Sequence, residues 1–199
     1  MSDASNATRS HTRHQTVVRL VQGDITTRPV DAIVNAADPK LSGGGGVDRA
    51  IHAAGGSAIR AACDAWLAEH EALQTGEAML TPGGDLPAAH VVHTVGPRFV
   101  DGQQSEYVLL ERAWRNSLQV AHGAEARRVA APSISTGTFQ FPIAEAALVA
   151  LNTTFRFIDG HRDAFDTIEI VVFSDADRDV WAARFDEVVE TMLGTPAAG

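Results

Sequence analysis

Short apolar runs alternate with longer amphipathic stretches along most of the chain. The short runs are rich in Val, Ile and Ala, and they predict strands at residues 17–21, 32–35, 77–81, 91–94, 129–132 and 168–173. In the longer stretches the apolar positions recur along one helix face, which predicts helices at residues 47–54, 57–72, 106–122, 143–157 and 178–192. Several strand segments are apolar at consecutive positions, as is typical of strands covered on both faces. We therefore expect a three-layer α/β/α sandwich with a central mixed, largely parallel sheet.

The two ends of the chain lack this pattern. Residues 1–15 are mostly Ser, Thr, Arg, His and Asn, which predicts a disordered N-terminal tail. Residues 194–199 are predicted to form a flexible C-terminal tail. Residues 16–193 contain no internal repeat and no linker-like segment, so we expect them to form a single domain.

Composition restricts the partners. The net charge of −9 disfavours binding to nucleic acid phosphates and to anionic membranes. No apolar run approaches the roughly 20 residues that span a bilayer, and the polar first residues lack the apolar segment of a secretory signal. We expect a cytoplasmic protein with neither nucleic acid nor membrane as a partner. Any anionic ligand must then be held locally, by backbone amides and helix ends.

The sequence predicts no metal site. Cys63 is the only cysteine, which argues against a disulfide and a Cys-based zinc site. It lies in an amphipathic helical stretch, which favours a buried thiol over a nucleophile. His90 and His93 are three positions apart on a predicted strand, so they point to opposite faces. His52, in the helix after a run of glycines, is interpreted as a packing or hydrogen-bonding residue.

The strongest chemical signal is the segment NAADPKLSGGGGVD at residues 35–48, between a predicted strand and a predicted helix. Four consecutive glycines carry no Cβ, so their backbone N–H groups can approach an anion closely. The following helix adds unpaired N–H groups and the positive end of its dipole. Together these features favour a diphosphate site without a lysine, while a plain flexible loop is the alternative. Neither a P-loop nor a GxGxxG pattern fits the spacing.

Asp48 stands at the start of that helix. One interpretation is an acidic residue in the first turn, favoured by the helix dipole. The other is functional: beside a diphosphate, the carboxylate would face a sugar hydroxyl or a water molecule.

Two further strand-end loops carry suitable groups. The first, PSISTGTFQFP at residues 132–142, offers hydroxyl and N–H donors before a helix. Its Phe139 and Phe141 can form walls of a sugar site or anchor the loop to the core. The second is GDIT at residues 23–26, where Asp24 can accept a hydrogen bond from an exocyclic amine or cap a turn.

Taken together, these segments resemble the macrodomain family, in the branch of the MacroD-type ADP-ribosyl hydrolases. The resemblance covers residues 17–188. It rests on GDIT at 23–26, DAIVNAA at 31–37, GGGGVDRAIH at 43–52, GEA at 76–78, HTVGP at 93–97 and PSISTG at 132–137 with the aromatics that follow. It implies the macrodomain fold, ADP-ribose as ligand or product, and no cofactor.

The resemblance also implies a pose for ADP-ribose. Asp24 would accept from the adenine amine, with the Ile25 backbone beside it and Phe173 as an aromatic wall. Asn35 and Asp48 would lie near the distal ribose, where Asp48 helps to orient or activate the attacking water. The diphosphate would be faced on one side by Gly45, Gly46 and Val47. Its other side and the distal ribose would be faced by Ser135, Thr136, Gly137, Thr138 and Phe139.

This chain departs from the family pattern at several positions. Asp38 replaces the second Asn of an Asn-Ala-Ala-Asn motif, and an ionised Asp accepts hydrogen bonds but donates none. Asp38 and Asp48 near one water can raise one pKa and form an acid–base pair, or they can repel the diphosphate. Arg49, Thr138 and Gln140 also differ from the usual residues.

The resemblance implies hydrolysis of ADP-ribosyl linkages by a positioned water. The expected substrates are mono-ADP-ribosylated proteins, above all esters of acidic residues, and O-acetyl-ADP-ribose; the catalytic candidates are Asp48, Asn35 and Asp38. Two alternatives remain open at this point. One is a catalytically weak or inactive reader of ADP-ribose or poly-ADP-ribose, and the other is an ADP-ribose 1″-phosphate phosphatase.

Overall fold

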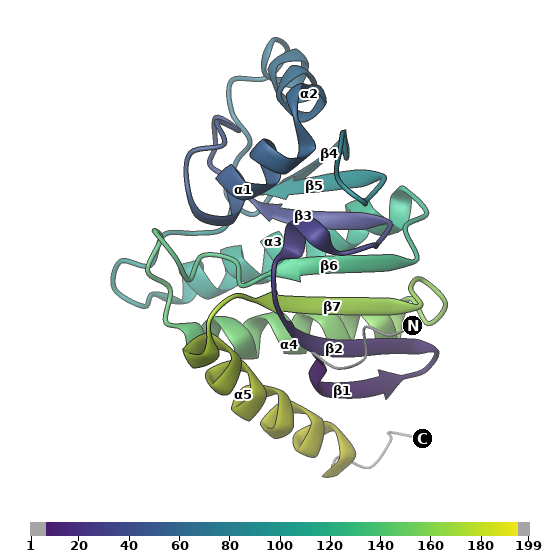
Figure 1. The fold of residues 1–199 in the computed structure, drawn as a ribbon. Helices are drawn as coiled ribbons and strands as arrows, with labels where there is room; N and C mark the ends of the chain where they lie inside the picture. Colours follow the sequence, from purple (N-terminus) through teal and green to yellow (C-terminus); the bar gives the residue numbers. More distant parts are fainter. Residues whose placement is uncertain (1–6, 195–199) are drawn as a thin grey trace.

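A seven-stranded sheet forms the middle of the computed structural model, which describes residues 7–194 (Figure 1). The strand order is β1-β2-β7-β6-β3-β5-β4. The inner strands from β2 to β5 run parallel, and the edge strands β1 and β4 are antiparallel to their neighbours. The bounds are β1 (Ala7–Arg13), β2 (Thr16–Gln22), β3 (Ala32–Ala36), β4 (Ala78–Pro82), β5 (His90–Thr94), β6 (Arg128–Pro132) and β7 (Thr167–Val172). The predicted mixed, largely parallel sheet is confirmed.

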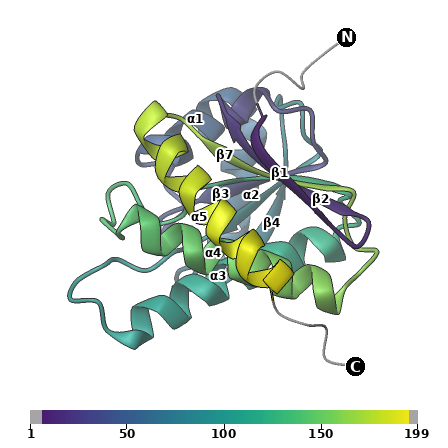
Figure 2. The same cartoon turned by 90° about the horizontal axis from the view of Figure 1, so that it is seen from below.

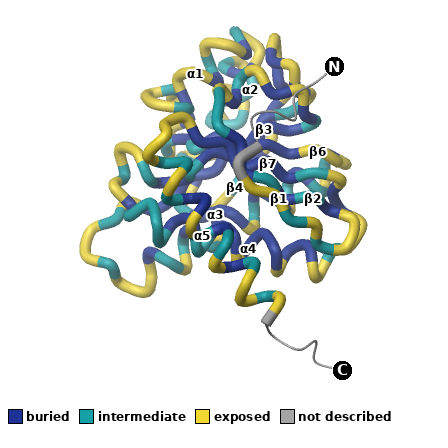
Figure 3. The backbone as a smooth tube through the Cα atoms, turned by 60° about the horizontal axis from the view of Figure 1, so that its bottom comes forward, coloured by how far each residue is buried: buried dark blue, intermediate teal, exposed yellow. Residues whose placement is uncertain are grey.

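Helices cover both faces of the sheet. Ala32 and Val34 of β3 face one hydrophobic cluster, which includes residues of α3, α4 and α5. Ile33 between them faces a second cluster, which includes residues of α1 and α2. Figure 2 shows α1 on one side of the sheet and α3 and α4 on the other, and burial is concentrated in the strands (Figure 3). The helices are α1 (Gly46–Gly55), α2 (Ser57–Leu67), α3 (Gln104–Gly123), α4 (Ile143–Gly160) and α5 (Asp175–Gly194), with a short 3-10 helix η2 (Ile25–Thr27). The three-layer α/β/α architecture is therefore confirmed.

The second helix ends earlier than its apolar pattern predicts. We expected it to reach residue 72, but α2 ends at Leu67. Leu73 is buried, and its backbone N–H donates to the carbonyl of Pro39 at 2.9 Å. That contact takes the chain off the helix axis and packs it against the glycine-containing segment.

The expected disordered tail over residues 1–15 is wrong for residues 7–13, because these form the edge strand β1. Composition was misleading here, since an edge strand needs little apolar surface and tolerates charge. Arg9 pairs with Asp186 of α5 at 2.8 Å, and Arg13 pairs with Asp159 of α4 at 2.7 Å. Residue 194 belongs to α5, while residues 1–6 and 195–199 lie outside the described part. None of the described helices is long and apolar enough to cross a membrane.

A buried charge cluster joins β2 and β7. Glu169 is 2% exposed and accepts hydrogen bonds from Arg19 and Arg28. The Arg28 guanidinium is nearly buried, with its Nε 2.7 Å from Glu169 Oε2. Such a cluster is costly to break from one side, because the remaining charges stay desolvated.

We expect Glu169→Gln to lower the free energy of unfolding by about 3 kcal/mol, because the substitution removes the negative charge between two guanidinium groups. Urea denaturation measures this change. The control is Glu187→Gln, which removes the partner of Arg184 in an exposed pair and should cost less than about 1 kcal/mol. Equal losses in the two variants would contradict the assignment of Glu169 as a buried counter-charge.

Candidate functional site

A cleft of ≈930 Å³ opens at the carboxyl ends of the parallel strands. Its walls come from segments that follow β2, β3, β5, β6 and β7 and from the start of α1. Ligands of open α/β sheets bind at this edge, because the loops that leave the strands converge there.

The cleft brings together nearly all of the residues singled out in the sequence. Among the predicted catalytic and ligand-binding residues, Asn35 is the one that does not line it. Several other lining residues were given no role in the sequence analysis, among them Gly96 and Ser133, which lie in quoted motifs, and Asp177. The residues expected there that do line it are Asp24, Ile25, Asp38, Gly45, Gly46, Val47, Asp48, Ser135, Thr136, Gly137, Thr138, Phe139 and Phe173.

The glycines of the run at residues 43–46 differ in what their lack of a side chain permits. Gly43 and Gly46 have φ angles of 72° and 56°, in the left-handed region that favours glycine. A Cβ on Gly43 would lie 3.0 Å from the His52 ring, so this glycine permits close packing on α1. A Cβ on Gly45 or Gly46 would meet no atom within 4 Å. The backbone of these two residues therefore borders open space at the N-terminus of α1, where unpaired N–H groups favour an anion.

The loop after β6 is held tightly. Ser135 is buried with a φ of 69°, an unusual conformation for a residue with a side chain. A Cβ on Gly96 would come within 2.1 Å of the Ser135 hydroxyl, so the loop after β5 needs glycine there. Trp181 of α5 donates from Nε1 to the Ser133 hydroxyl at 3.1 Å. Gln140 has a φ of 56°, which gives a physical reason for the glycine that the family pattern has at this place.

The two phenylalanines of this loop, Phe139 and Phe141, differ in position: one lines the cleft and the other packs in the core. Phe141 is 2% exposed and packs edge-on against Phe99 and Tyr107 in the core. Phe139 lines the cleft, and the Arg98 guanidinium lies 5.2 Å from the centre of its ring. Phe141 therefore anchors the loop, and Phe139 forms part of the wall.

The opposite end of the cleft is acidic and aromatic. Asp24 accepts hydrogen bonds through Oδ1 from the backbone and hydroxyl of Thr26, so it caps η2 and also lines the cleft. Phe173 is 81% exposed. Asp177 reaches this end from the first turn of α5. Sequence reasoning missed Asp177 because an acid in a first helical turn is common without any ligand.

Asp48 is buried and held by two different segments. One carboxylate oxygen accepts a hydrogen bond from Asn35 Nδ2 at 2.7 Å, and the other accepts from the backbone N–H of Gly44 at 3.0 Å. His52 lies one turn along α1, with Nε2 3.5 Å from Asp48 Oδ1. The spacing of four residues on one helix was the signal for this neighbour, and the sequence interpretation passed over it.

Asn35 lies behind Asp48. Its side chain is fully buried, donates to Asp48 and also contacts His93 Nδ1 at 3.1 Å. Its side chain does not line the cleft, where its neighbours Ala36 and Ala37 lie, so the expected place near the distal ribose stays a prediction. The alternation of β3 directs the Asn35 side chain towards its strand neighbour His93.

Asp38 caps its own loop. Its oxygens accept from the backbone N–H of Lys40 at 2.7 Å, from the backbone N–H of Ser42 at 3.0 Å and from the Ser42 hydroxyl. Partial burial opposes the charge, but these hydrogen bonds outweigh it and lower the pKa of Asp38. An acid–base pair in which Asp38 has the raised pKa is therefore contradicted.

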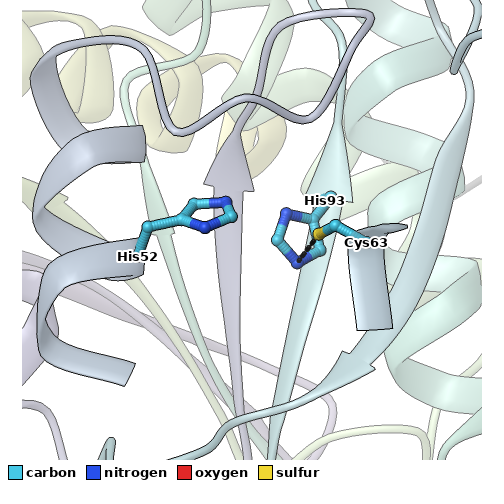
Figure 4. A group of neighbouring side chains, drawn as sticks. All are labelled: His52, Cys63 and His93. Carbon is cyan, nitrogen blue, oxygen red and sulfur yellow. Dashed lines mark hydrogen bonds between the residues drawn. The ribbon is translucent and has the colours of Figure 1, made fainter. Parts of the chain in front are cut away.

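His52, Cys63 and His93 form a cluster that no linear spacing indicates (Figure 4). One potential metal-ligating atom from each lies within 4.8 Å of the others. The sequence interpretation, which treated these residues one by one, missed the cluster, because it forms only where α1, α2 and β5 converge. Burial raises the pKa of the Cys63 thiol to about 11 and lowers the pKa of His93 to about 3. At neutral pH the thiol is protonated and the His93 ring is neutral.

The fold and its cleft define an α/β protein with a ligand-sized cleft at the carboxyl ends of its parallel strands. Comparison with known proteins identifies the family. The family model described as Macro domain matches residues 34–150. The chain therefore belongs to the macrodomain family.

Relatives of similar length support this assignment. A Macro domain-containing protein of Lactiplantibacillus plantarum is 46% identical over 165 residues, which cover 83% of this chain and 94% of the relative. A Salmonella typhimurium protein named O-acetyl-ADP-ribose deacetylase is 49% identical over 141 residues, which cover 71% of this chain and 79% of the relative.

Solved structures agree with the fold. The Oceanobacillus iheyensis macrodomain with ADP has a TM-score of 0.86 and 35% identity, covering 92% of this chain and 97% of that one. The Trypanosoma brucei macrodomain in complex with ADP-ribose has a TM-score of 0.76 and 34% identity, covering 83% and 68% of the two chains.

The buried, neutral His93 predicts a loss of stability in acid. Below its ordinary pKa of 6.5 the unfolded imidazole binds a proton that the folded one, with a pKa of about 3, does not. Stability is therefore complete above about pH 6.5 and falls as the pH drops towards 3. Between pH 6.5 and 4.5 this group should cost about 2 to 3 kcal/mol, at about 1.4 kcal/mol per pH unit.

Urea denaturation at the two pH values, on the wild type and on His93→Gln, measures that contribution. The variant should lose less stability on acidification than the wild type does. His70→Gln removes an exposed imidazole and serves as the control. Identical losses in the wild type and His93→Gln would contradict a neutral, buried His93.

Proposed function

We propose that this chain binds ADP-ribose in the cleft and hydrolyses ester linkages to it through a water oriented by Asp48. The substrates are O-acetyl-ADP-ribose and proteins mono-ADP-ribosylated on acidic side chains. The observation that carries the proposal is the Asp48 carboxylate, buried at the edge of the glycine loop and fixed through both oxygens.

The helix N-terminus at the cleft and the ligands of similar solved structures support binding of ADP-ribose. Asp24, Asp38, Asp48 and Asp177 all line the cleft, so carboxylates cannot be what attracts a diphosphate. Backbone N–H groups at the start of α1 supply the positive potential instead. The similar Trypanosoma brucei structure holds ADP-ribose, and the Oceanobacillus iheyensis structure holds ADP.

The pose follows from the two ends of the cleft. The adenine lies at the end formed by Asp24 and Phe173, where a carboxylate accepts from the amine and a ring offers a face. The diphosphate passes between Gly45–Gly46 and the loop after β6. The distal ribose then reaches Asp48, on the glycine-loop side.

The chemistry needs a water in place and an acceptor for one of its protons. Each Asp48 oxygen accepts one hydrogen bond from the protein and keeps capacity for another. As the oxygen of this water attacks the ester carbonyl carbon, Asp48 accepts one of its protons and passes it to the leaving alkoxide oxygen, so that the acid and the alcohol separate as the ester C–O bond breaks. The similar proteins named O-acetyl-ADP-ribose deacetylase support this reaction class.

A non-catalytic reader is the second candidate. The observation that favours it is the negative charge of Asp38, which the lowered pKa maintains beside the glycine loop. Asp38 replaces an amide that the family pattern has there and that helps to position the distal ribose, so the change counts against turnover more than against binding. The two functions share the ligand and differ in turnover.

Asp48→Ala is expected to lower kcat for ester-linked ADP-ribose by at least about 100-fold, because the oriented water is lost. Its affinity for ADP-ribose should change only severalfold. Mass spectrometry on ester-, N- and phosphate-linked substrates measures turnover, and calorimetry measures binding. Asp64→Ala, which removes an exposed acid of α2, is the control.

Each other outcome selects another function. Tight ADP-ribose binding with no turnover of any linkage selects the reader, and release of inorganic phosphate selects the phosphatase. Equal turnover by the wild type and Asp48→Ala would remove Asp48 from the mechanism. No binding of millimolar ADP-ribose would exclude the cleft as its site.

Asp38→Asn is expected to tighten ADP-ribose binding by about threefold to tenfold at low salt, because one negative charge leaves the cleft. The gain should shrink at high salt. Stability should fall by about 1 kcal/mol, since the amide nitrogen cannot accept from Ser42. Calorimetry at two salt concentrations tests this, and unchanged low-salt affinity would show that the ligand does not sense Asp38.

A further inference from the structure

A line of buried polar side chains lies beneath Asp48, and beyond Asn35 the proposed reaction makes no use of it. Asn35, His93 and Thr81 stand on the adjacent strands β3, β5 and β4. The first two are fully buried and Thr81 is 3% exposed. We call these three residues the buried chain. Its hydrogen bonds run in one direction, which the groups at its two ends fix.

The direction starts at Asp48. An ionised carboxylate only accepts hydrogen bonds, so the Asn35 atom 2.7 Å from it is the amide nitrogen. That nitrogen also lies 3.1 Å from His93 Nδ1, and its second hydrogen points there. His93 Nδ1 must therefore present a lone pair.

The same direction holds at the other end. His93 is neutral, because burial lowers its pKa to about 3, so its one ring proton is on Nε2. Nε2 lies 2.9 Å from the Thr81 hydroxyl. The hydroxyl accepts a hydrogen bond from Nε2–H and donates its own hydrogen bond to the backbone carbonyl of Pro82 at 3.1 Å. A backbone carbonyl can only accept, so the far end of the buried chain cannot reverse.

Little else holds the Asn35 amide. Its oxygen is buried and has no hydrogen-bond partner within residues 7–194. If the His93 proton moved to Nδ1, it would face the amide nitrogen. The amide would then turn and place its oxygen against the Asp48 carboxylate, which is repulsive.

We propose that Thr81 and His93 are positioning residues that keep the Asn35 amide turned with its N–H towards Asp48. They act through hydrogen bonds of one fixed direction, anchored on the Pro82 carbonyl. The effect on turnover rests on the proposed function. The orientation of the amide is a property of the protein without substrate and is measured separately.

The same directions weigh against the cluster of Figure 4 as a metal site. Nδ1 of His93 accepts from Asn35, and Nε2 carries the proton donated to Thr81. Neither nitrogen then offers a lone pair to a cation. The protonated Cys63 thiol, with Sγ 3.9 Å from His93 Nε2, is a further obstacle.

The test compares three substitutions of buried threonines. Thr81→Val keeps the shape but removes the acceptor of His93, and Thr81→Ser restores a hydroxyl. Thr94→Val is the matched control, because Thr94 is a buried residue of β5 whose hydroxyl donates at 2.8 Å to the Glu77 carbonyl, outside the buried chain. Substrate turnover, ADP-ribose affinity and thermal unfolding are measured for each.

Thr81→Val is expected to lower kcat by about tenfold or more, with the ADP-ribose Kd within about twofold of the wild type. Thr81→Ser should recover most of the loss. Thr94→Val should keep wild-type kcat even if it lowers Tm as much as Thr81→Val does. Equal kcat losses in Thr81→Val and Thr94→Val would reduce the effect to general destabilisation and overturn the proposal.

Nitrogen-15 NMR of the substrate-free protein gives a readout that turnover does not affect. The wild-type His93 ring should carry its proton on Nε2, and Thr81→Val should shift it towards Nδ1 and move the Asn35 side-chain amide signals. A wild-type proton on Nδ1, or an Asn35 amide unchanged in Thr81→Val, would overturn the proposal. If the wild type hydrolyses no substrate, the proposed function fails while these spectra still decide the orientation of the amide.

Discussion

A carboxylate that is almost completely buried must receive hydrogen bonds, and much of the region around Asp48 is arranged to supply them. Its two donors come from opposite sides: the Gly44 amide from the glycine loop and the Asn35 amide from the central sheet. The loop is thereby tied to β3 through a side chain of α1. The conformation that exposes the backbone of Gly45 and Gly46 is thus coupled to the placement of the Asp48 carboxylate, because Asp48 is bonded to both the loop and β3.

The acidic character of the cleft has a related origin. Three of the carboxylates that line the cleft accept hydrogen bonds from nearby segments: Asp24 caps η2, Asp38 closes a turn and Asp48 links two segments. These carboxylates supply no positive charge, so the attraction of an anion to the cleft is left to the peptide backbone at the start of α1. Selectivity then depends on shape and hydrogen-bond direction more than on net charge, which suits a protein with a formal charge of −9.

Much of this could be predicted from the sequence, since the strand and helix periods and the strand-end loops are local features. The cleft residues lie in those loops, and the order of short motifs places them together once a parallel sheet is assumed. What failed depends on contacts between distant segments. The ion pairs that fix β1 involve Asp159 and Asp186, far along the chain. Likewise, the burial of Asn35 and the meeting of Cys63 with His93 depend on strand register and helix placement.

The position of β7 in the sheet has a consequence for folding during synthesis. Although it is the last of the strands within residues 7–194, it is inserted between β2 and β6, so the hairpin of β1 and β2 has no further neighbour in the sheet until β7 is made. The helix that follows supplies Trp181 and Asp177 to the loops around the cleft. A nascent chain that stops before residue 167 therefore lacks both the strand that joins β2 to β6 and one end of the cleft. The cleft is therefore complete only after β7 and the start of α5 have been made, and folding is governed by long-range strand pairing.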